Sequence, residues 1–164
     1  MLQIRRNIWE TNSSSTHSLS MKKWELNTPL SWTSMDVFQK EYIIEPVECP
    51  SPTYATYTTI DQKLAYFYTL YKMVDHNYNW LMKKLKQLFP NAKFVENFTD
   101  NWYVFEDGDY WIDEEFFKNI TLEELAIFML YGVIKFGNRD DEEFMDKIYK
   151  LHRDPDTWGC YWCG

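Results

Sequence analysis

The chain of 164 residues fits a single domain, and its 8 Trp, 12 Tyr and 11 Phe supply ample apolar area for a core. Its net charge of −8 argues against a general binder of nucleic acids or anionic membranes, because such a binder needs a basic surface. The 3 cysteines do not suit a disulfide framework, and the sequence shows neither a secretory signal nor an apolar run of about 18 residues. We therefore expect a cytoplasmic protein that does not enter a membrane.

The first elements are predicted to be strands. Residues 2–9 and 17–21 both alternate between apolar and polar side chains, which is typical of strands that bury one face. The polar residues 10–16 lie between them and are predicted to form the long loop of an antiparallel N-terminal hairpin.

Prolines interrupt residues 22–58 and exclude a long element there. Within this stretch we expect a short helix at 34–42 with Ser34 as its N-cap, then a strand at 43–47. The proline-rich residues 50–58 are expected to form an extended loop.

Two helices are predicted in the middle of the chain. Thr59 and Gln62 have the spacing of a capping box, in which each side chain bonds the backbone of the other residue. The apolar residues that follow share one helical face: Leu64, Phe67, Tyr68, Tyr71 and Val74. A second amphipathic segment covers 79–89, and Pro90 is expected to end it.

The second half of the chain is predicted to contain a meander and two more helices. Strand patterns around the Asp107-Gly108 turn predict the meander over residues 93–113. Thr121 and Glu124 form another capping box, before an apolar run that is expected to stay helical through about Lys135. The pair Gly137-Asn138 is expected to close this run.

A last amphipathic helix is predicted to begin at Asp140 and to carry Phe144, Ile148 and Leu151 on one face. These patterns together indicate an α+β protein with antiparallel strands and about four helices. We expect one domain at 1–153 and an irregular tail at 154–164.

The N-terminal loop concentrates chemically active side chains. Its hydroxyls, amides and guanidinium groups are suited to holding an anion such as phosphate. The candidate ligand-binding residues are Arg5, Arg6, Asn12, Ser13, Ser14, Ser15, Thr16 and His17. If the protein is an enzyme, His17 would be the acid or base, Ser14 the nucleophile and Glu10 an orienting group. A loop that only satisfies its own backbone explains the same residues, so the sequence leaves all three interpretations open.

The cysteines allow one metal site. Cys160 and Cys163 form a Cys-x-x-Cys pair, and Cys49 and His152 would complete the four ligands of tetrahedral zinc. Reduced thiols without metal are the alternative interpretation. Apart from this structural zinc, no cofactor is predicted.

Charge is segregated along the chain. Residues 96–124 contain ten acidic residues and one basic residue, whereas residues 63–93 lean basic. An acidic run often only solvates a surface, but it also suits docking on a basic groove. The residues that combine charge with aromatic rings are the candidates for partner binding: Glu106, Asp107, Asp109, Tyr110, Trp111 and Asp113.

The N-terminal motif resembles a known signature. Asn7 is followed by two apolar residues, by Glu-Thr-Asn-Ser-Ser-Ser at residues 10–15, and by Thr16-His17-Ser18. This pattern resembles the N-terminus of small uncharacterised proteins of bacteriophages and prophages. The resemblance covers about a tenth of the chain. It implies a viral accessory protein that acts in the cytoplasm of an infected bacterium, and it transfers no catalytic role.

These observations favour a non-enzymatic phage accessory protein. It would bind a basic groove on a host protein that handles nucleic acids or serves in defence, and would modulate or inhibit that protein. The competing hypothesis is a small nucleotide- or phosphate-binding enzyme built on the N-terminal loop. A minor component of the virion is a third interpretation.

Overall fold

The computed structural model describes residues 15–46, 55–73, 79–96 and 118–163. Its strands are β1 (Ser15–Lys22), β2 (Tyr42–Ile44), β3 (Ala55–Tyr57), β4 (Ala92–Phe94), β5 (Val133–Asn138) and β6 (Thr157–Cys163). Its helices are the 3₁₀ helix η1 (Lys23–Asn27) and the α-helices α1 (Trp32–Phe38), α2 (Ile60–Met73), α3 (Asn79–Leu88), α5 (Leu122–Tyr131) and α6 (Glu142–Arg153). The predicted α+β class is confirmed.

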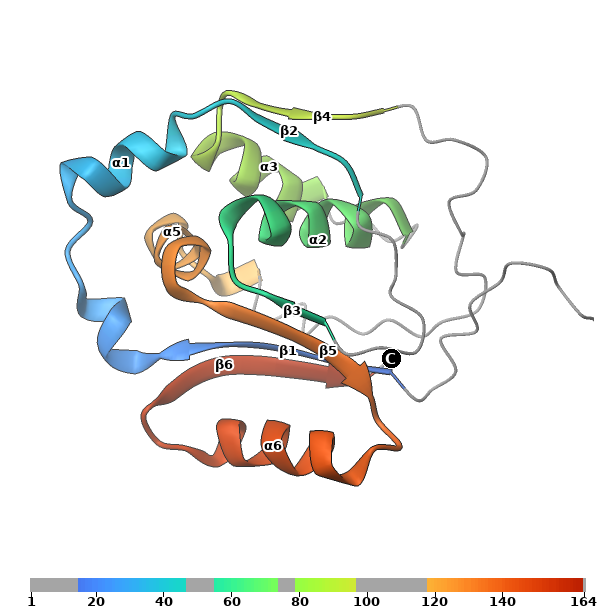
Figure 1. The fold of residues 1–164 in the computed structure, drawn as a ribbon. Coiled ribbons are helices and arrows are strands. Elements are labelled where there is room, and N and C mark those ends of the chain that lie inside the picture. The colour runs from blue at the N-terminus through green and yellow to red at the C-terminus, as the bar shows by residue number, and fades with distance from the viewer. Residues whose placement is uncertain (1–14, 47–54, 74–78, 97–117, 164) are drawn as a thin grey trace, which may run out of the picture.

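The larger sheet has four antiparallel strands in the order β3-β5-β1-β6. Helix α6 lies against one face of this sheet, and α2, α3 and α5 lie on the other side (Figure 1). A small parallel sheet of β2 and β4 lies beyond α2 and α3. The chain therefore buries both faces of the larger sheet.

The central strand β1 separates an apolar face from a polar one. Leu19 and Met21 belong to the hydrophobic core, whereas the buried Ser18 and Ser20 alternate with them and occupy the face toward α6. Because serine side chains are small, α6 can lie close to the sheet. Ile148 and Met145 are the buried side chains of this helix.

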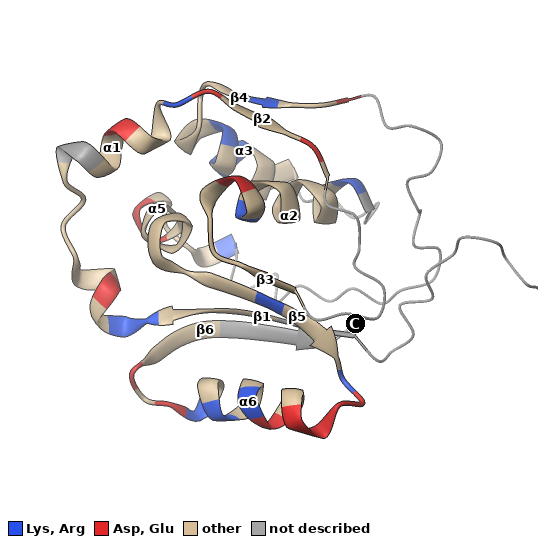
Figure 2. Ribbon diagram, viewed as in Figure 1, with Lys and Arg blue, Asp and Glu red and all other residues tan. Residues whose placement is uncertain are grey.

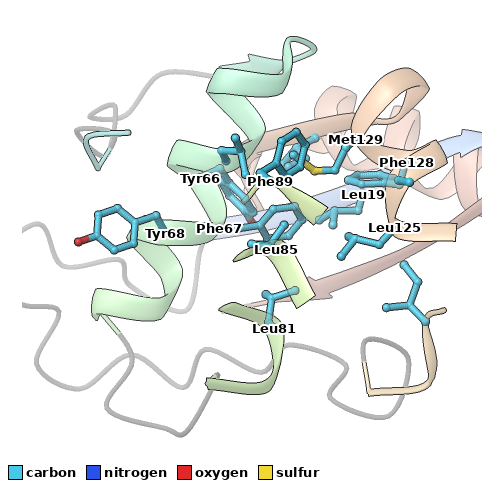
Figure 3. Close-up of a cluster of buried hydrophobic side chains, with 14 of the residues drawn as sticks. Leu19, Tyr66, Phe67, Tyr68, Leu81, Leu85, Phe89, Leu125, Phe128 and Met129 are labelled. Carbon is cyan, nitrogen blue, oxygen red and sulfur yellow. The ribbon is translucent and has the colours of Figure 1, made fainter. Parts of the chain in front are cut away.

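Aromatic rings, most of them on the helices, pack in the core with Leu, Ile and Met side chains (Figure 3). Phe67 of α2 meets Phe128 of α5 edge to face with ring centres 6.3 Å apart, and Phe128 lies 6.0 Å from Trp158 of β6. These contacts join α2, α5 and the far edge of the sheet in one cluster. Each buried ring removes about 150–250 Å² from water, so few residues suffice to hold the layers together.

One charged side chain lies inside this core. Lys63 of α2 has no solvent exposure, and its Nζ donates hydrogen bonds to the carbonyl oxygens of Gly132 at 2.7 Å and Phe128 at 3.2 Å. Burial lowers the pKa of Lys63 to about 8, with Glu25 acting in the opposite direction. The side chain therefore remains mostly protonated at neutral pH. The last carbonyl oxygens of a helix lack intrahelical donors and carry partial negative charge, and the ammonium group of Lys63 supplies hydrogen bonds and positive charge there.

The two predicted capping boxes and the predicted end of a helix before Pro90 are confirmed. Thr121 Oγ1 accepts from the backbone of Glu124 at 3.1 Å, and Glu124 accepts from the backbone of Thr121 at 2.8 Å. Gln62 accepts from the backbone of Thr59 at 3.2 Å in the same way. Helix α3 ends at Leu88, just before Pro90. This end was predicted because proline has no backbone N–H with which to continue the helix. Each of these signals lies within a few residues of the element that it defines.

Two predicted N-caps are wrong, one by three residues and the other by one. Ser31 caps α1, since its hydroxyl accepts from the backbone of Ser34 at 3.1 Å, so Ser34 lies inside the helix that it was expected to begin. Asp141 caps α6 by accepting from the backbone of Phe144 at 3.0 Å, in place of Asp140. Both stretches contain neighbouring polar residues that are able to cap a helix, so local chemistry does not choose between them.

The predicted N-terminal hairpin is wrong in its pairing. Between Thr16 and Ser20, β1 has β5 on one edge and β6 on the other. A strand has only two edges, so residues 2–9, which lie outside the described part of the chain, are not its neighbour there. Of the predicted meander at 93–113, only β4 is described, and it pairs in parallel with β2.

The predictions for two C-terminal segments are also wrong. The helix expected through Lys135 ends at Tyr131, and Val133–Asn138 forms β5. A β-carbon at Gly132 would lie 2.6 Å from the carbonyl oxygen of Phe128, so only glycine fits where the chain leaves the helix. The tail expected to be irregular contains β6, which binds β1 along its whole length.

Replacing Lys63 by Met tests the role of the buried ammonium group. Met fills a similar volume and favours helix, but it removes the Lys63 donor from the carbonyl oxygen of Gly132 and one of the two donors to that of Phe128, which keeps the backbone N–H of Gly132 at 2.7 Å. We expect the free energy of unfolding in urea to fall by about 2 kcal/mol. The control is Lys147→Met, which removes an exposed lysine from α6 and should change stability little. Equal losses in the two variants would contradict the assigned role.

Candidate functional site

The described residues contain the end of the N-terminal motif. The structure describes the backbone of Ser15, Thr16 and His17 in β1. For Ser18 it also describes the side chain. His17 is paired with Phe136 of β5 and with Trp162 of β6. The motif therefore ends in the middle of the larger sheet rather than in a loop.

Ser18 contacts a residue from the other end of the chain. Its Oγ lies 3.1 Å from Nε2 of His152, in the last turn of α6. Burial lowers the pKa of His152, so the imidazole is neutral at pH 7 and is able to accept the proton of the hydroxyl. The pair has the composition of a nucleophile and its base. However, Ser18 has no solvent exposure, so in this arrangement the contact joins α6 to β1 and offers no access to a substrate.

A second polar cluster surrounds Asp154, two residues after His152. The carboxylate of Asp154 accepts hydrogen bonds from Nζ of Lys22 at 2.7 Å and from Oγ1 of Thr157 at 3.0 Å. It also accepts from the backbone of Asp156 at 2.9 Å. The hydrogen bond from Lys22 is the largest of the effects that lower the pKa of Asp154 to about 2. This cluster closes the turn between α6 and β6 over the end of β1.

Most of the predicted site residues lie outside the described part of the chain. These are Arg5, Arg6, Glu10, Asn12, Ser13 and Ser14 of the loop, Cys49 of the metal set, and Glu106, Asp107, Asp109, Tyr110, Trp111 and Asp113. Of the metal set, His152 contacts Ser18, while Cys160 and Cys163 are described by backbone position alone, opposite Leu19 and Thr16. Among the described side chains no three His, Cys, Asp or Glu residues form a metal-binding group. The zinc site stays a prediction.

The structure describes the chain on both sides of the acidic segment, residues 97–117. Before it, the hydroxyl of the buried Tyr68 donates to the carbonyl oxygen of Val95 at 2.7 Å. After it, Nζ of Lys84 donates to the carbonyl oxygens of Ile120 at 2.6 Å and Lys118 at 3.2 Å. Tyr68 belongs to α2 and Lys84 to α3, which pack together. The chain just before and just after residues 97–117 is therefore held by two helices that pack together.

Lys72 adds an ion pair at the first of these ends. Its Nζ lies 3.4 Å from a carboxylate oxygen of Glu96 and 5.6 Å from the ring centre of Tyr68. Proximity to the Tyr68 hydroxyl and to Glu96 raises the pKa of Lys72, against the effect of burial. Glu96, the last acidic residue before residues 97–117, thus forms an ion pair with a lysine of α2.

The described residues, which we call the scaffold, differ sharply in charge from residues 97–117. Within the described residues, Lys and Arg balance Asp and Glu in number, and both signs are distributed over the fold (Figure 2). Residues 97–117 contain seven acidic residues and no basic residue. Most of the net charge of −8 therefore belongs to one segment between β4 and α5.

No protein-family model matches the chain, and comparison with curated proteins and with solved structures gives no match either. None of the helices in the described residues is long and apolar enough to cross a membrane.

Sequence reasoning missed both polar clusters. Ser18 and His152 are separated by 134 positions, and no local pattern connects them. The Asp154 cluster had a detectable signal, because Asp-Pro-Asp-Thr at residues 154–157 is typical of a turn in which the first side chain bonds the following backbone.

Replacing Ser18 by Ala tests the contact with α6. The change removes the hydroxyl that meets His152, and we expect a loss of about 1 kcal/mol in the free energy of unfolding, measured in urea. Ser20→Ala is the matched control, because Ser20 is buried on the same strand and no side-chain hydrogen bond links it to another residue in the described part of the chain. The assignment fails if Ser20→Ala costs as much as Ser18→Ala.

Asp154 should make stability depend on pH in strongly acidic solution. Its pKa is lowered in the folded state, so it stabilises the fold above its usual range near 3.8, and this contribution disappears as the pH falls to about 2. We expect Asp154→Asn to be less stable than the parent chain at pH 7, with the difference shrinking between about pH 5 and pH 2. Thermal unfolding across this range measures it, and a constant difference would refute it.

Proposed function

We propose that this protein is a phage accessory protein that binds a basic surface of a host protein through its acidic, aromatic segment. The host protein would be one that handles nucleic acids or serves in defence, and binding would modulate or inhibit it. The observation that carries the proposal is the separation of a charge-balanced scaffold from a strongly acidic segment.

The charge distribution supports this proposal over simple solvation. A protein that is acidic only for solubility has its acidic residues spread over its surface. Here the described elements carry both signs, with Lys147 and Lys150 of α6 each paired to an acid four residues earlier. Segregated charge speeds association with a surface of opposite sign and disfavours partners of like sign.

The fixed ends support it as well. Tyr68 and Lys84 bind the backbone on either side of the segment, at Val95 and Ile120, so the chain is held before and after it. Holding both ends of a chain segment lowers the conformational entropy that it loses when a partner binds it. The aromatic residues within the segment, Tyr110 and Trp111, are the types that contribute most to binding energy at interfaces.

The phage origin and the cytoplasmic site of action rest on the N-terminal resemblance. The motif at residues 7–18 resembles that of small phage and prophage proteins, and such proteins meet their partners inside the infected bacterium. An alternative is a nucleotide- or phosphate-binding enzyme that uses the loop before β1. The described end of that loop favours it less, because Ser18 is closed to solvent.

The test is capture of the host partner, followed by measurement of its affinity for two variants. The first variant changes Glu106, Asp107, Asp109 and Asp113 to the corresponding amides. The control variant changes four exposed acids of the scaffold in the same way: Asp36, Glu45, Asp61 and Asp140. We expect roughly tenfold weaker binding or more in the first variant and little change in the control.

Salt provides the second readout for the same partner. The dissociation constant of the parent chain should rise as NaCl increases from about 50 to about 500 mM, because salt screens exposed charges. The first variant should show a smaller rise. An affinity that is the same for both variants, or independent of salt, would overturn the proposal.

A further inference from the structure

Lys135 of β5 is a partly buried cation without a partner in the described residues. The described lysines that are largely covered from solvent are Lys63, Lys84 and Lys135. The ammonium groups of Lys63 and Lys84 each donate to two carbonyl oxygens. Lys135 forms neither an ion pair nor a hydrogen bond with any residue that the structure describes. Because a charge that folding removes partly from water is stable only with a partner, Lys135 has the properties of a ligand-binding group.

Lys135 belongs to a row of polar residues across the larger sheet, which we call the polar row. It lies directly opposite Ser18 of β1 on one side and Thr56 of β3 on the other. Residues that lie opposite each other in antiparallel strands project from the same face, with β-carbons about 5 Å apart. Ser18 contacts His152 of α6, so this is the face toward α6. The polar row therefore places an ammonium group between two hydroxyl groups.

The outer part of the polar row is accessible to a small molecule. Helix α6 packs mainly on β6 at one edge of the larger sheet, whereas β3 forms the opposite edge (Figure 1). Accordingly, Ser18 has no solvent exposure, Lys135 is partly exposed and Thr56 is exposed. The described residues thus leave Lys135 and Thr56 open to solvent, with Ser18 at the inner end of the row.

The charge around the polar row is positive. The sequences of β1, β3 and β5 contain no acidic residue. On α6, Glu143 and Asp146 are each paired with a lysine of their own helix. The strands that carry the row therefore attract an anion locally, although the whole chain has a net charge of −8.

We propose that Lys135 and Thr56 bind the phosphate group of a small molecule on this face of the larger sheet. The ammonium group supplies positive charge, and the threonine hydroxyl supplies a second hydrogen bond to the phosphate oxygens. One lysine suits one anionic group, whereas a nucleic-acid backbone needs a longer basic surface.

The N-terminal motif supports this assignment independently. Its hydroxyl-rich composition is suited to holding an anion, and its described end, Ser18, is the inner neighbour of Lys135. The contact of Ser18 with His152 fixes this end of the row against α6. The inference goes beyond the proposed function and uses no residue of the acidic segment.

The experiment is a titration of the full chain with sodium phosphate at constant ionic strength, followed through the backbone amide signals in NMR spectra. We expect saturable shifts at the amides of Thr56 and Lys135. Lys135→Gln should weaken binding roughly tenfold or more, because it removes a hydrogen bond from a charged group. The matched control, Lys147→Gln, removes an exposed lysine of α6 and should bind phosphate like the parent chain.

Thr56→Val is the second variant, because Thr56 is exposed and valine is favoured in strands. It should also weaken binding, and it decides the test if Lys135→Gln lowers the melting temperature. Adenosine monophosphate is the second probe: tighter binding than that of inorganic phosphate assigns the site to a phosphate ester, and equal binding assigns it to the free ion.

Two results would overturn the inference. One is a parent chain without saturable shifts for either probe, and the other is unchanged affinity in a folded Lys135→Gln or Thr56→Val variant. Neither result bears on the proposed function, which fails separately if the host partner binds the variant with four amides in the acidic segment normally.

Discussion

Lys63 connects parts of the fold that are far apart in the sequence. It lies on α2, and its ammonium group binds the last turn of α5 and the glycine from which β5 begins. β5 in turn pairs with both β1 and β3, so the direction in which the chain leaves α5 determines where half of the larger sheet lies. A buried charge is stable only when it has enough partners. The two carbonyl oxygens and the nearby Phe128 ring supply them, at the point where the helix ends.

This non-local cap explains why the sequence predicts the elements better than their arrangement. The capping boxes at Thr59 and Thr121, the stop before Pro90 and the apolar faces of α2 and α6 depend on neighbouring residues, so local patterns identify them. The carbonyl oxygens at the end of α5 bind Lys63, which lies far away in the sequence, and residues 132–135 alone look as suitable for a helix as for a strand. In the same way, β6 reads as an irregular tail because its partner β1 lies at the other end of the chain.

The candidate sites differ in the same way, because one depends on local composition and the other on contacts between distant residues. The acidic segment is visible in the sequence because charge is a property of composition, and the structure adds that Tyr68 and Lys84 hold its two ends. The contact between Ser18 and His152 is invisible in the sequence, although both residues stand out separately, one in the motif and one in the metal set. The two side chains meet because α6 packs against β1 in the folded protein. The motif therefore has at least one structural role, which no count of its hydroxyl groups would have revealed.

The position of β1 has a consequence for how the protein is made. Its two neighbours, β5 and β6, both come long after β1 in the chain and are therefore synthesised later. Until they are made, this strand has neither of its partners, and its backbone donors and acceptors stay open to other chains. The alternating serines of β1 keep one of its faces polar during that interval, which makes the nascent strand less adhesive than a fully apolar one.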